Sequence, residues 1–170
     1  LQKIIKVVDP RPGEIMFGLN MVVNKGRTVF IGDTSVHEYP TSKQLAEIAI
    51  SSARVVRLFG FTPKIAFLSH STFGQPMTSR TKHIRDAVEI LKKMKVDFKF
   101  DGDMQPDVAL NDEYKELYPL SDIVGNANVL IMPGQHSAAI SYKIMKSMSS
   151  AKVIGPVSYT HLRAHETSTY

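Results

Sequence analysis

Hydroxyl side chains, a glycine and an arginine occur close together in residues 69–74 (SHSTFG) and the segment that follows. Hydroxyl groups, backbone N–H groups at the start of a helix and a guanidinium are donors that hold phosphate or a developing oxyanion. The spacing therefore predicts a binding site for an anionic substrate. The candidate residues in this part of the chain are Ser69, Ser71, Thr72, Gly74 and Arg80.

Further polar segments follow other apolar runs, at residues 32–35, 101–107 and 134–137. The carboxyl ends of neighbouring parallel strands meet at one edge of a sheet, and ligands collect there. We therefore expect these segments to lie beside residues 69–74. The additional candidates for substrate binding are Thr34, Asp103, Gln105, Asp107, His136 and Ser137.

Each of these groups also has a structural interpretation that the sequence leaves open. Residues 69–74 could be a surface turn that caps a helix. Asp103 and Asp107 could stabilise a helix start, where acidic side chains interact favourably with the helix dipole. His136 is a single histidine at a helix start, so a cap, a substrate contact and a catalytic role all remain open.

Three elements must position the first group of candidates. Residues 65–68 are a short apolar run typical of a buried strand, and residues 79–94 repeat apolar side chains at helical spacing. Residues 96–100 alternate as a second strand does. Strand, loop, helix and strand in this order predict a crossover between parallel strands, with both polar segments at one rim.

The remaining pattern is that of an α/β protein. Residues 14–23 and 27–31 are β-prone and are separated by Asn24-Lys25-Gly26, which suits a tight hairpin turn. Thr41 and Gln44 form a capping box ahead of a helix that ends near Gly60. The other predicted elements are short helical pieces in residues 103–118, a strand at 128–132 and a helix at 135–148. The fold class is a three-layer α/β/α sandwich whose mostly parallel sheet contains one antiparallel hairpin.

Composition limits the classes of function. The chain has 170 residues, a formal charge of +5, 43% hydrophobic residues and no cysteine. It contains no apolar run of the roughly 20 residues that a membrane helix needs, and the absence of cysteine excludes disulfides, thiol nucleophiles and thiolate zinc sites. The positive charge is dispersed, so we expect an anionic small molecule as partner, with no nucleic acid and no membrane. We expect a cytoplasmic protein.

The two ends differ from the centre. Residues 1–13 read as the end of a helix followed by a Pro-rich linker, and residues 14–157 as one α/β unit. Residues 158–170 (SYTHLRAHETSTY) have no apolar periodicity and resemble translated vector sequence, so we expect a non-native tail. His161 and His165 within it have a spacing that could hold a metal on a helix, but we predict no metal site.

Four motifs in this order carry a family resemblance: GRTVFIGDT (26–34), LSHSTFG (68–74), DGDMQPDVAL (101–110) and GNANVLIMP (125–133). Together they resemble the phosphate acetyl/butyryltransferase (phosphotransacetylase) family. The phrases STFG, DVALN, ANVLIMP and HSAAIS are most similar to the phosphotransacetylase-like domain at the carboxyl end of large NADP-dependent malic enzymes. The resemblance covers residues 15–157.

The resemblance implies a fold related to the isocitrate and isopropylmalate dehydrogenases, with an acyl-CoA site between two α/β lobes. This chain resembles one lobe. The family's Arg-Gly-Cys-Ser segment and catalytic Asp follow the point that corresponds to Gly155-Pro156, so we expect no catalytic residue in this chain. The implied substrates or effectors are acetyl-CoA, CoA and phosphate, without a covalently bound cofactor.

Two functions fit this resemblance. The first is an acyltransferase lobe that exchanges acetyl groups between CoA and phosphate and is inactive as an isolated fragment. The second is a non-catalytic domain of a hybrid NADP-dependent malic enzyme, which senses acetyl-CoA and assembles the oligomer. A domain that only dimerises is a third possibility, and a homo-oligomeric parent is expected in each case.

Overall fold

The computed structural model describes residues 15–158, in which six strands form one sheet in the order β4-β3-β5-β2-β1-β6. The strands are β1 (Gly18–Asn24), β2 (Arg27–Gly32), β3 (Lys64–Leu68), β4 (Lys99–Met104), β5 (Val129–Ile131) and β6 (Lys152–Ser158). The helices are α2 (Ser42–Leu58), α3 (Ser79–Met94), α4 (Pro106–Leu110), the 3-10 turn η1 (Asp112–Tyr114) and α5 (Gln135–Met148).

Strand direction divides the sheet into two parts. Strands β4, β3, β5 and β2 pair in parallel, which confirms the predicted crossover from β3 through α3 to β4. Strand β1 is antiparallel to β2 and also to β6. The turn between β1 and β2 contains Lys25 and Gly26 with φ angles of 47° and 78°, the backbone conformation that a tight hairpin requires.

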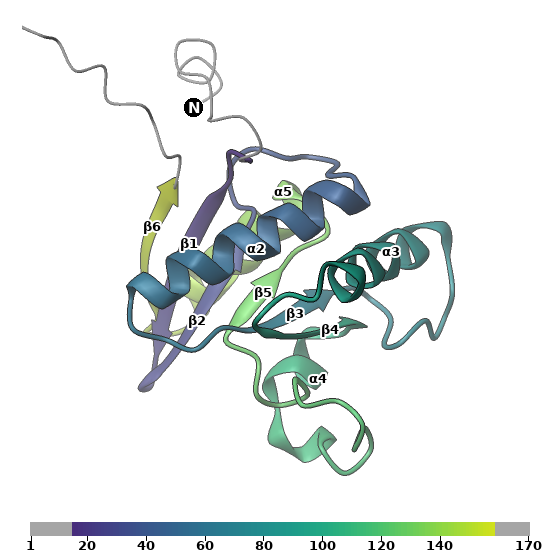
Figure 1. Cartoon of the computed structure of the whole chain (residues 1–170). Coiled ribbons are helices and arrows are strands. Elements are labelled where there is room, and N and C mark those ends of the chain that lie inside the picture. Colours follow the sequence, from purple (N-terminus) through teal and green to yellow (C-terminus); the bar gives the residue numbers. More distant parts are fainter. Residues whose placement is uncertain (1–14, 159–170) are drawn as a thin grey trace, which may run out of the picture.

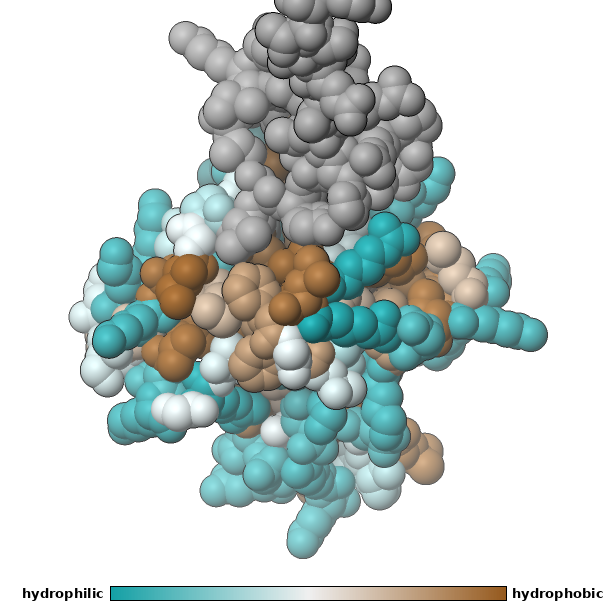
Figure 2. Space-filling model, turned by 60° about the vertical axis from the view of Figure 1, so that its left-hand side comes forward, coloured by the Kyte–Doolittle hydropathy of each residue, from teal (hydrophilic) through white to brown (hydrophobic). Residues whose placement is uncertain are grey.

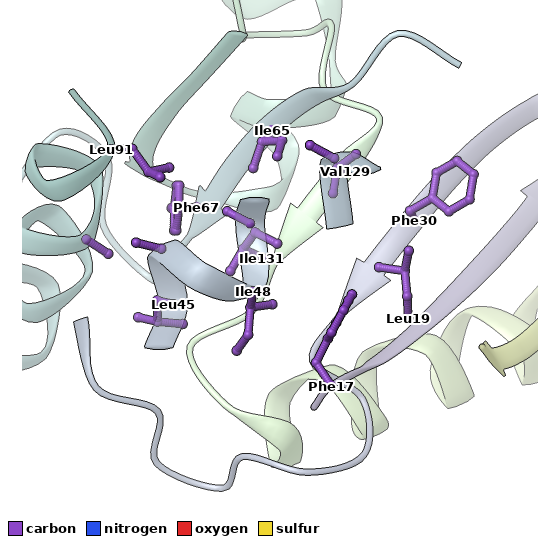
Figure 3. Close-up of a cluster of buried hydrophobic side chains, with 14 of the residues drawn as sticks. Phe17, Leu19, Phe30, Leu45, Ile48, Ile65, Phe67, Leu91, Val129 and Ile131 are labelled. Atoms are coloured by element: carbon purple, nitrogen blue, oxygen red, sulfur yellow. The ribbon is translucent and has the colours of Figure 1, made fainter. Parts of the chain in front are cut away.

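One face of the sheet packs against α2 and α3. Apolar side chains at helical spacing on these helices, including Leu45, Ile48 and Leu91, meet strand residues such as Phe67 and Ile131 in one buried cluster (Figure 3). Full burial of side chains of this size stabilises the fold by about 1.5–3 kcal/mol each. This cluster fixes α3, and therefore Arg80 in its first turn, against the sheet.

The other face carries α4 and α5 over a second buried cluster. Its members include Leu68 and Met104 from neighbouring strands, Val108 from α4 and Ala138 from α5. Figure 1 shows α2 and α3 in front of the sheet and α5 behind it. The sheet is therefore covered by helices on both of its faces.

Capping explains where the two long helices begin. Thr41 and Gln44 form the predicted capping box of α2, with side-chain to backbone bonds in both directions. Thr78 and Thr81 form a second capping box at the start of α3. The helix limits predicted at 79–94 and 135–148 are confirmed.

Strand β4 corrects one sequence prediction. It runs from Lys99 to Met104, whereas the pattern predicted a strand at residues 96–100 followed by a polar loop. Asp101-Gly102-Asp103 reads as a turn, because carboxylates and glycine are rare inside strands. The structure accommodates Asp103 within the strand because each of its carboxylate oxygens accepts a hydrogen bond from the loop after β3.

Several predictions lie outside the described residues, namely the helix at the amino-terminal end, the histidine pair His161 and His165, and the segment from residue 159 onward. Ser158 itself ends strand β6 and pairs with Gly18. Between residues 15 and 158, no helix is long and apolar enough to cross a membrane. Figure 2 shows one face of the molecule, on which hydrophobic side chains reach the surface in separate groups among hydrophilic ones.

Candidate functional site

The carboxyl ends of four parallel strands form one rim, as the sequence predicted. The sheet order places the ends of β4, β3, β5 and β2 next to one another. Backbone hydrogen bonds continue past the strands, from Ser69 N–H to the Met104 carbonyl at 2.9 Å and from Met132 N–H to the Gly32 carbonyl at 2.7 Å. The polar segments that follow these strands are thereby brought together.

The hydroxyl side chains of the loop after β3 lie in the interior. Ser71 is completely buried, and Ser69 and Thr72 are 9% and 7% exposed. The two serine hydroxyls lie 3.2 Å apart, and Thr72 Oγ1 accepts a hydrogen bond from Gln105 N–H at 3.2 Å. These hydroxyl groups connect the loop to β4 and to the start of α4, so they shape the rim from within.

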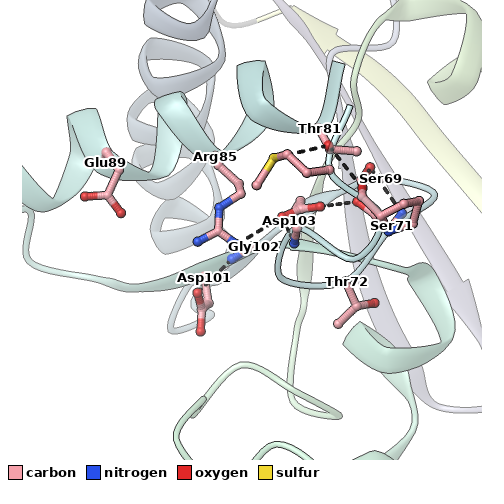
Figure 4. A network of polar contacts seen from close by, with 12 residues as sticks. Ser69, Ser71, Thr72, Thr81, Arg85, Glu89, Asp101, Gly102 and Asp103 are labelled. Atoms are coloured by element: carbon pink, nitrogen blue, oxygen red, sulfur yellow. Dashed lines mark hydrogen bonds and ion pairs between the residues drawn. The ribbon is translucent and has the colours of Figure 1, made fainter. Parts of the chain in front are cut away.

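Asp103 is the centre of this internal network and is 0% exposed (Figure 4). Its carboxylate accepts hydrogen bonds from the Ser71 hydroxyl and, at 3.0 Å, from Gly74 N–H. Arg85 Nη1 lies 3.8 Å from the same carboxylate. A buried carboxyl group needs such partners, and together they fix the loop after β3 against the end of β4.

A second buried carboxylate, Asp33, organises the segment after β2. It accepts hydrogen bonds from the N–H groups of Gly18, Ser35, Val36 and His37, and Nδ1 of His37 lies 2.6 Å from Oδ2. Burial by itself raises the pKa of Asp33, but the hydrogen bonds from His37, Gly18 and Ser35 outweigh it and lower the pKa below its ordinary value of 3.8. Asp33 therefore remains ionised and holds residues 34–37 in place.

Thr34 lies beside this carboxylate and is 7% exposed. Its hydroxyl is 3.5 Å from the hydroxyl of Ser35, and its N–H donates to the carbonyl of Gly18 at 2.9 Å. Thr34 is thus part of the segment that forms the rim beside β1.

Three predicted residues meet at the surface of the rim. Arg80, His136 and Ser137 line one cavity of about 190 Å³, together with Glu38. Arg80 also lines an adjoining cavity of about 330 Å³ that includes His83. We call these two cavities, joined at Arg80, the rim groove.

Charges around the rim groove are mixed. His136 Nε2 lies 3.3 Å from Glu38 Oε1, and both side chains are more than half exposed. Ser137 Oγ donates to the carbonyl of Gly134 at 3.2 Å. Arg80 is exposed in the first turn of α3, where the helix dipole adds to its attraction for anions. The groove is therefore suited to an anionic group held mainly by Arg80.

Gln105 and Asp107 lie at the start of α4, outside the residues that line the rim groove. Gln105 precedes Pro106 and makes no side-chain cap. Asp107 is an acid in the first turn of α4 and accepts a hydrogen bond from the Tyr114 hydroxyl at 3.1 Å, which raises the pKa of Tyr114. The helix-start interpretation that the sequence left open for Asp107 agrees with this geometry.

Sequence reasoning missed four residues that shape the rim: Asp33, His37, Tyr39 and Arg85. A usable signal existed for Asp33, since Gly-Asp occurs after β2 and again within β4. Arg85 had none, because its spacing matched the polar face of α3. Among residues 15–158, no three His, Cys, Asp or Glu side chains gather as a metal site would require.

Comparisons with known sequences give a consistent result. The sequence model of one protein family, described as phosphate acetyl/butaryl transferase, matches residues 1–160. The chain is 43% identical over 157 residues to the NADP-dependent malic enzyme of Rhizobium meliloti (strain 1021), covering 92% of this chain and 21% of that enzyme. It is 40% identical over 163 residues to the phosphate acetyltransferase of Clostridium acetobutylicum, covering 90% of this chain and 49% of that enzyme.

Solved structures agree with the sequence comparisons. A phosphotransacetylase from Streptococcus pyogenes is similar with a TM-score of 0.88 and 29% identity, covering 95% of this chain and 50% of that one. A branched-chain phosphotransacylase from Enterococcus faecalis V583 has a TM-score of 0.72 and 26% identity, covering 84% of this chain and 55% of that one. The chain spans about half the length of these acyltransferases and about a fifth of the malic enzyme.

Proposed function

Because the chain belongs to the phosphate acetyl/butyryltransferase family, we propose that its rim groove forms one wall of a cleft that binds acetyl-CoA and phosphate. The observation that carries this proposal is the meeting of Arg80, His136 and Ser137 in one cavity at the carboxyl ends of the strands. Open α/β sheets bind their ligands at this edge.

The reaction of such a cleft is acyl transfer. A phosphate oxygen attacks the thioester carbonyl carbon, and the bond to sulfur breaks as the CoA thiolate leaves and takes a proton. The step needs cationic donors that hold the anions in place and stabilise the developing oxyanion. In the rim groove, Arg80 holds a phosphate group of CoA or inorganic phosphate, and the helix dipole of α3 adds to the attraction.

The buried candidates have a different part in this proposal. Ser69, Ser71, Thr72, Gly74 and Asp103 fix the loop that leads to α3, and Thr34 belongs to the segment organised by Asp33. Gln105 and Asp107 lie at the start of α4, outside the rim groove, and their proposed role is contact with the part of an extended ligand such as CoA that leaves the groove. None of these side chains is assigned a bond-breaking role.

We propose that the sheet and its two helical layers are one lobe of the two-lobed dehydrogenase-like fold, and that the opposite lobe supplies the catalytic Arg and Asp. A single wall leaves the thioester open to water on its other side. The chain alone is therefore expected to form no acetyl phosphate from acetyl-CoA. Acetyl phosphate production by the purified chain would contradict this part of the proposal.

Binding is tested by titrating the chain with CoA in a thermal-shift assay. At a hundred times its dissociation constant, a bound ligand adds about 2.7 kcal/mol to the free energy of unfolding. Arg80→Gln should weaken binding about tenfold, since it removes a charged donor. The matched control is Lys82→Gln, which removes the same charge from α3 at a residue outside the rim groove. Equal loss in both variants, or no stabilisation of the unsubstituted chain, would oppose the proposal.

The second candidate is an acetyl-CoA-sensing domain of a malic enzyme that does not turn over. The similarity to the Rhizobium meliloti enzyme over nearly the whole chain favours this candidate. The two functions are separated in the full-length parent by two assays. CoA-dependent acetyl phosphate formation supports the enzyme, whereas its absence together with inhibition of malate oxidation by acetyl-CoA supports the sensor.

We also propose a homo-oligomer and a cytoplasmic location. Oligomerisation is supported by three exposed apolar side chains at intervals of four on α5, namely Ile140, Ile144 and Met148. The location is supported by the substrates proposed above, which are metabolites of the cytoplasm.

A further inference from the structure

A separate cavity of about 400 Å³ lies between α3, β4 and residues 117–121. It is distinct from the rim groove, with which it shares no lining residue. Strand β4 is at one end of the sheet order, so this cavity lies at the edge of the sheet, and we call it the edge cavity. Its volume is in the range of small-molecule sites. The function proposed above makes no use of it.

One wall of the edge cavity is apolar. The rings of Phe73 and Tyr118 pack against each other with centroids 5.3 Å apart. Leu117 and Leu120 lie beside them, and both are strongly exposed to solvent, Leu120 completely. Exposed leucine side chains around an aromatic pair favour a ligand that brings its own apolar group to cover them.

The other wall carries one cation with free donors. Within the part of the chain that the structure describes, Arg85 makes no hydrogen bond. Its one ion pair is with Asp103 at 3.8 Å, and it also attracts the Glu89 carboxylate electrostatically. Its side chain is 37% exposed and lines the cavity. A guanidinium has five N–H donors in a planar fork that matches a carboxylate. Arg85 can therefore bind a carboxylate of a ligand.

An acceptor lies on the neighbouring strand. The Asp101 carboxylate accepts one hydrogen bond among the described residues, from Gly102 N–H at 2.9 Å. Arg85 from α3 and Asp101 from β4 both line this cavity, and Figure 4 draws them with the network around Asp103. The remaining charges at the cavity, Glu89 and Lys92, already pair with each other at 2.8 Å. Asp101 is thus left to receive an ammonium group.

We propose that the edge cavity binds a free α-amino acid with an apolar side chain. The ligand carboxylate binds Arg85, its ammonium group binds Asp101, and its side chain covers Phe73, Tyr118 and Leu120. A zwitterion adds no net charge to a cavity whose own cations and carboxylates already balance. A simple carboxylate would lack the contact with Asp101, and an amine would lack the contact with Arg85.

Arg85 also connects this cavity to the rim. Its guanidinium is near the buried carboxylate of Asp103, which fixes the loop after β3. A Cβ atom added to Gly74 would lie 3.1 Å from Arg85 Nη1, so the arginine packs directly against that loop. A ligand that orders Arg85 therefore also acts on the loop that precedes α3.

The experiment is calorimetric titration of the 170-residue chain with three probes. These are L-phenylalanine, 3-phenylpropionate, which lacks the ammonium group, and phenethylamine, which lacks the carboxylate. L-phenylalanine should bind saturably and about tenfold more tightly than either analogue, the effect of one charge-assisted hydrogen bond. Absence of saturable L-phenylalanine binding, or equal binding of the three probes, would overturn the proposal.

Two variants assign the charged contacts. Asp101→Asn retains an oxygen for Gly102 N–H and should abolish the preference for L-phenylalanine over 3-phenylpropionate. Arg85→Gln should weaken L-phenylalanine about tenfold. Lys93→Gln is the control, because it removes one charge from α3 outside the cavity and should bind like the unsubstituted chain. If Asp101→Asn keeps the full preference, the assignment is wrong. Asp101→Asn therefore tests the proposed site even if Arg85→Gln does not fold.

Discussion

At the scale of single residues, buried carboxylates organise both sides of the rim. Asp103 accepts hydrogen bonds from Ser71 and Gly74, and Asp33 accepts them from residues of the segment after β2. The hydrogen bonds to each carboxylate compensate for the hydration that it loses on burial. The same hydrogen bonds hold the donating loop in one conformation. The rim is therefore rigid where its polar side chains face inward.

Replacement of Asp103 by alanine should lower the free energy of unfolding by about 3 kcal/mol, because Ser71 and Gly74 lose their acceptor and Arg85 its charged partner. Urea denaturation measures this difference. Asp103→Asn keeps one acceptor oxygen and should lose less. Asp122→Asn is the control, since Asp122 is exposed and its ion pair with Lys99 lies at the surface. Equal stability of Asp103→Ala and the control would show that the network is dispensable.

Asp33 gives the fold a defined dependence on pH. Its pKa in the folded protein is below 3.8, so the unfolded chain binds the proton more readily than the folded chain does. Its contribution to stability is fully present above pH 3.8 and is lost as the pH falls through the lower, folded pKa. Stability should therefore rise with pH through this window.

Urea denaturation at neutral pH and at about pH 3 checks this prediction, with Asp33→Asn as the comparison. The difference in unfolding free energy between the two proteins should shrink at the acidic pH. If this difference stays constant or grows at the acidic pH, the predicted direction of the Asp33 contribution is wrong.

At the scale of elements, periodicity and capping predicted the helices well. The limits of α3 and α5 agree with the sequence prediction, because apolar spacing and the flanking turn residues point to the same ends. The limits of β4 could not be predicted, since the partners of Asp103 come from a loop some thirty positions earlier in the chain. Local patterns carry no information about such distant hydrogen bonds.

The capping box at Thr78 should stabilise α3 and hold Arg80 at the rim. Thr78 Oγ1 accepts from Thr81 N–H, and Thr81 Oγ1 accepts from Thr78 N–H. Thr78→Ala should cost about 1 kcal/mol of unfolding free energy, measured by urea denaturation. Ser79→Ala, one residue later in α3, is the control and should have a much smaller effect. A larger loss of stability in Ser79→Ala than in Thr78→Ala would show that Thr78 is not the capping residue of α3.

At the scale of the whole molecule, the sequence predicted which polar segments lie at the rim but not how their side chains are oriented. The sequence predicted that the carboxyl ends of the strands lie together, and Arg80, His136 and Ser137 line one cavity there. It could not show that Ser71 and Asp103 are turned inward, since a polar side chain after a strand has the same sequence signal in either orientation. Burial depends on packing across the sheet, which becomes visible only in the folded chain.

The apolar stripe of α5 should make the protein associate. Ile140, Ile144 and Met148 are 57%, 51% and 83% exposed. Covering them with the same stripe of a second copy removes apolar area from water, which favours a dimer. Sedimentation should show a mass that rises with concentration, and Ile144→Lys should shift it toward the monomer. Lys146→Gln, on the same helix outside the stripe, should leave it unchanged; a monomer at all concentrations would refute this role.

The hydrogen bonds of Asp103 extend from strand β4 into a loop. The N–H of Phe73 donates to the backbone carbonyl of Asp103 at 2.7 Å, and the N–H of Gly74 donates to the Asp103 carboxylate at 3.0 Å. These two amides should exchange with deuterium as slowly as the amides between β3 and β4, because both sets open in the same cooperative unit. A surface turn would exchange fast and independently, so the kinetics of these two protons report whether the loop unfolds with the sheet or before it.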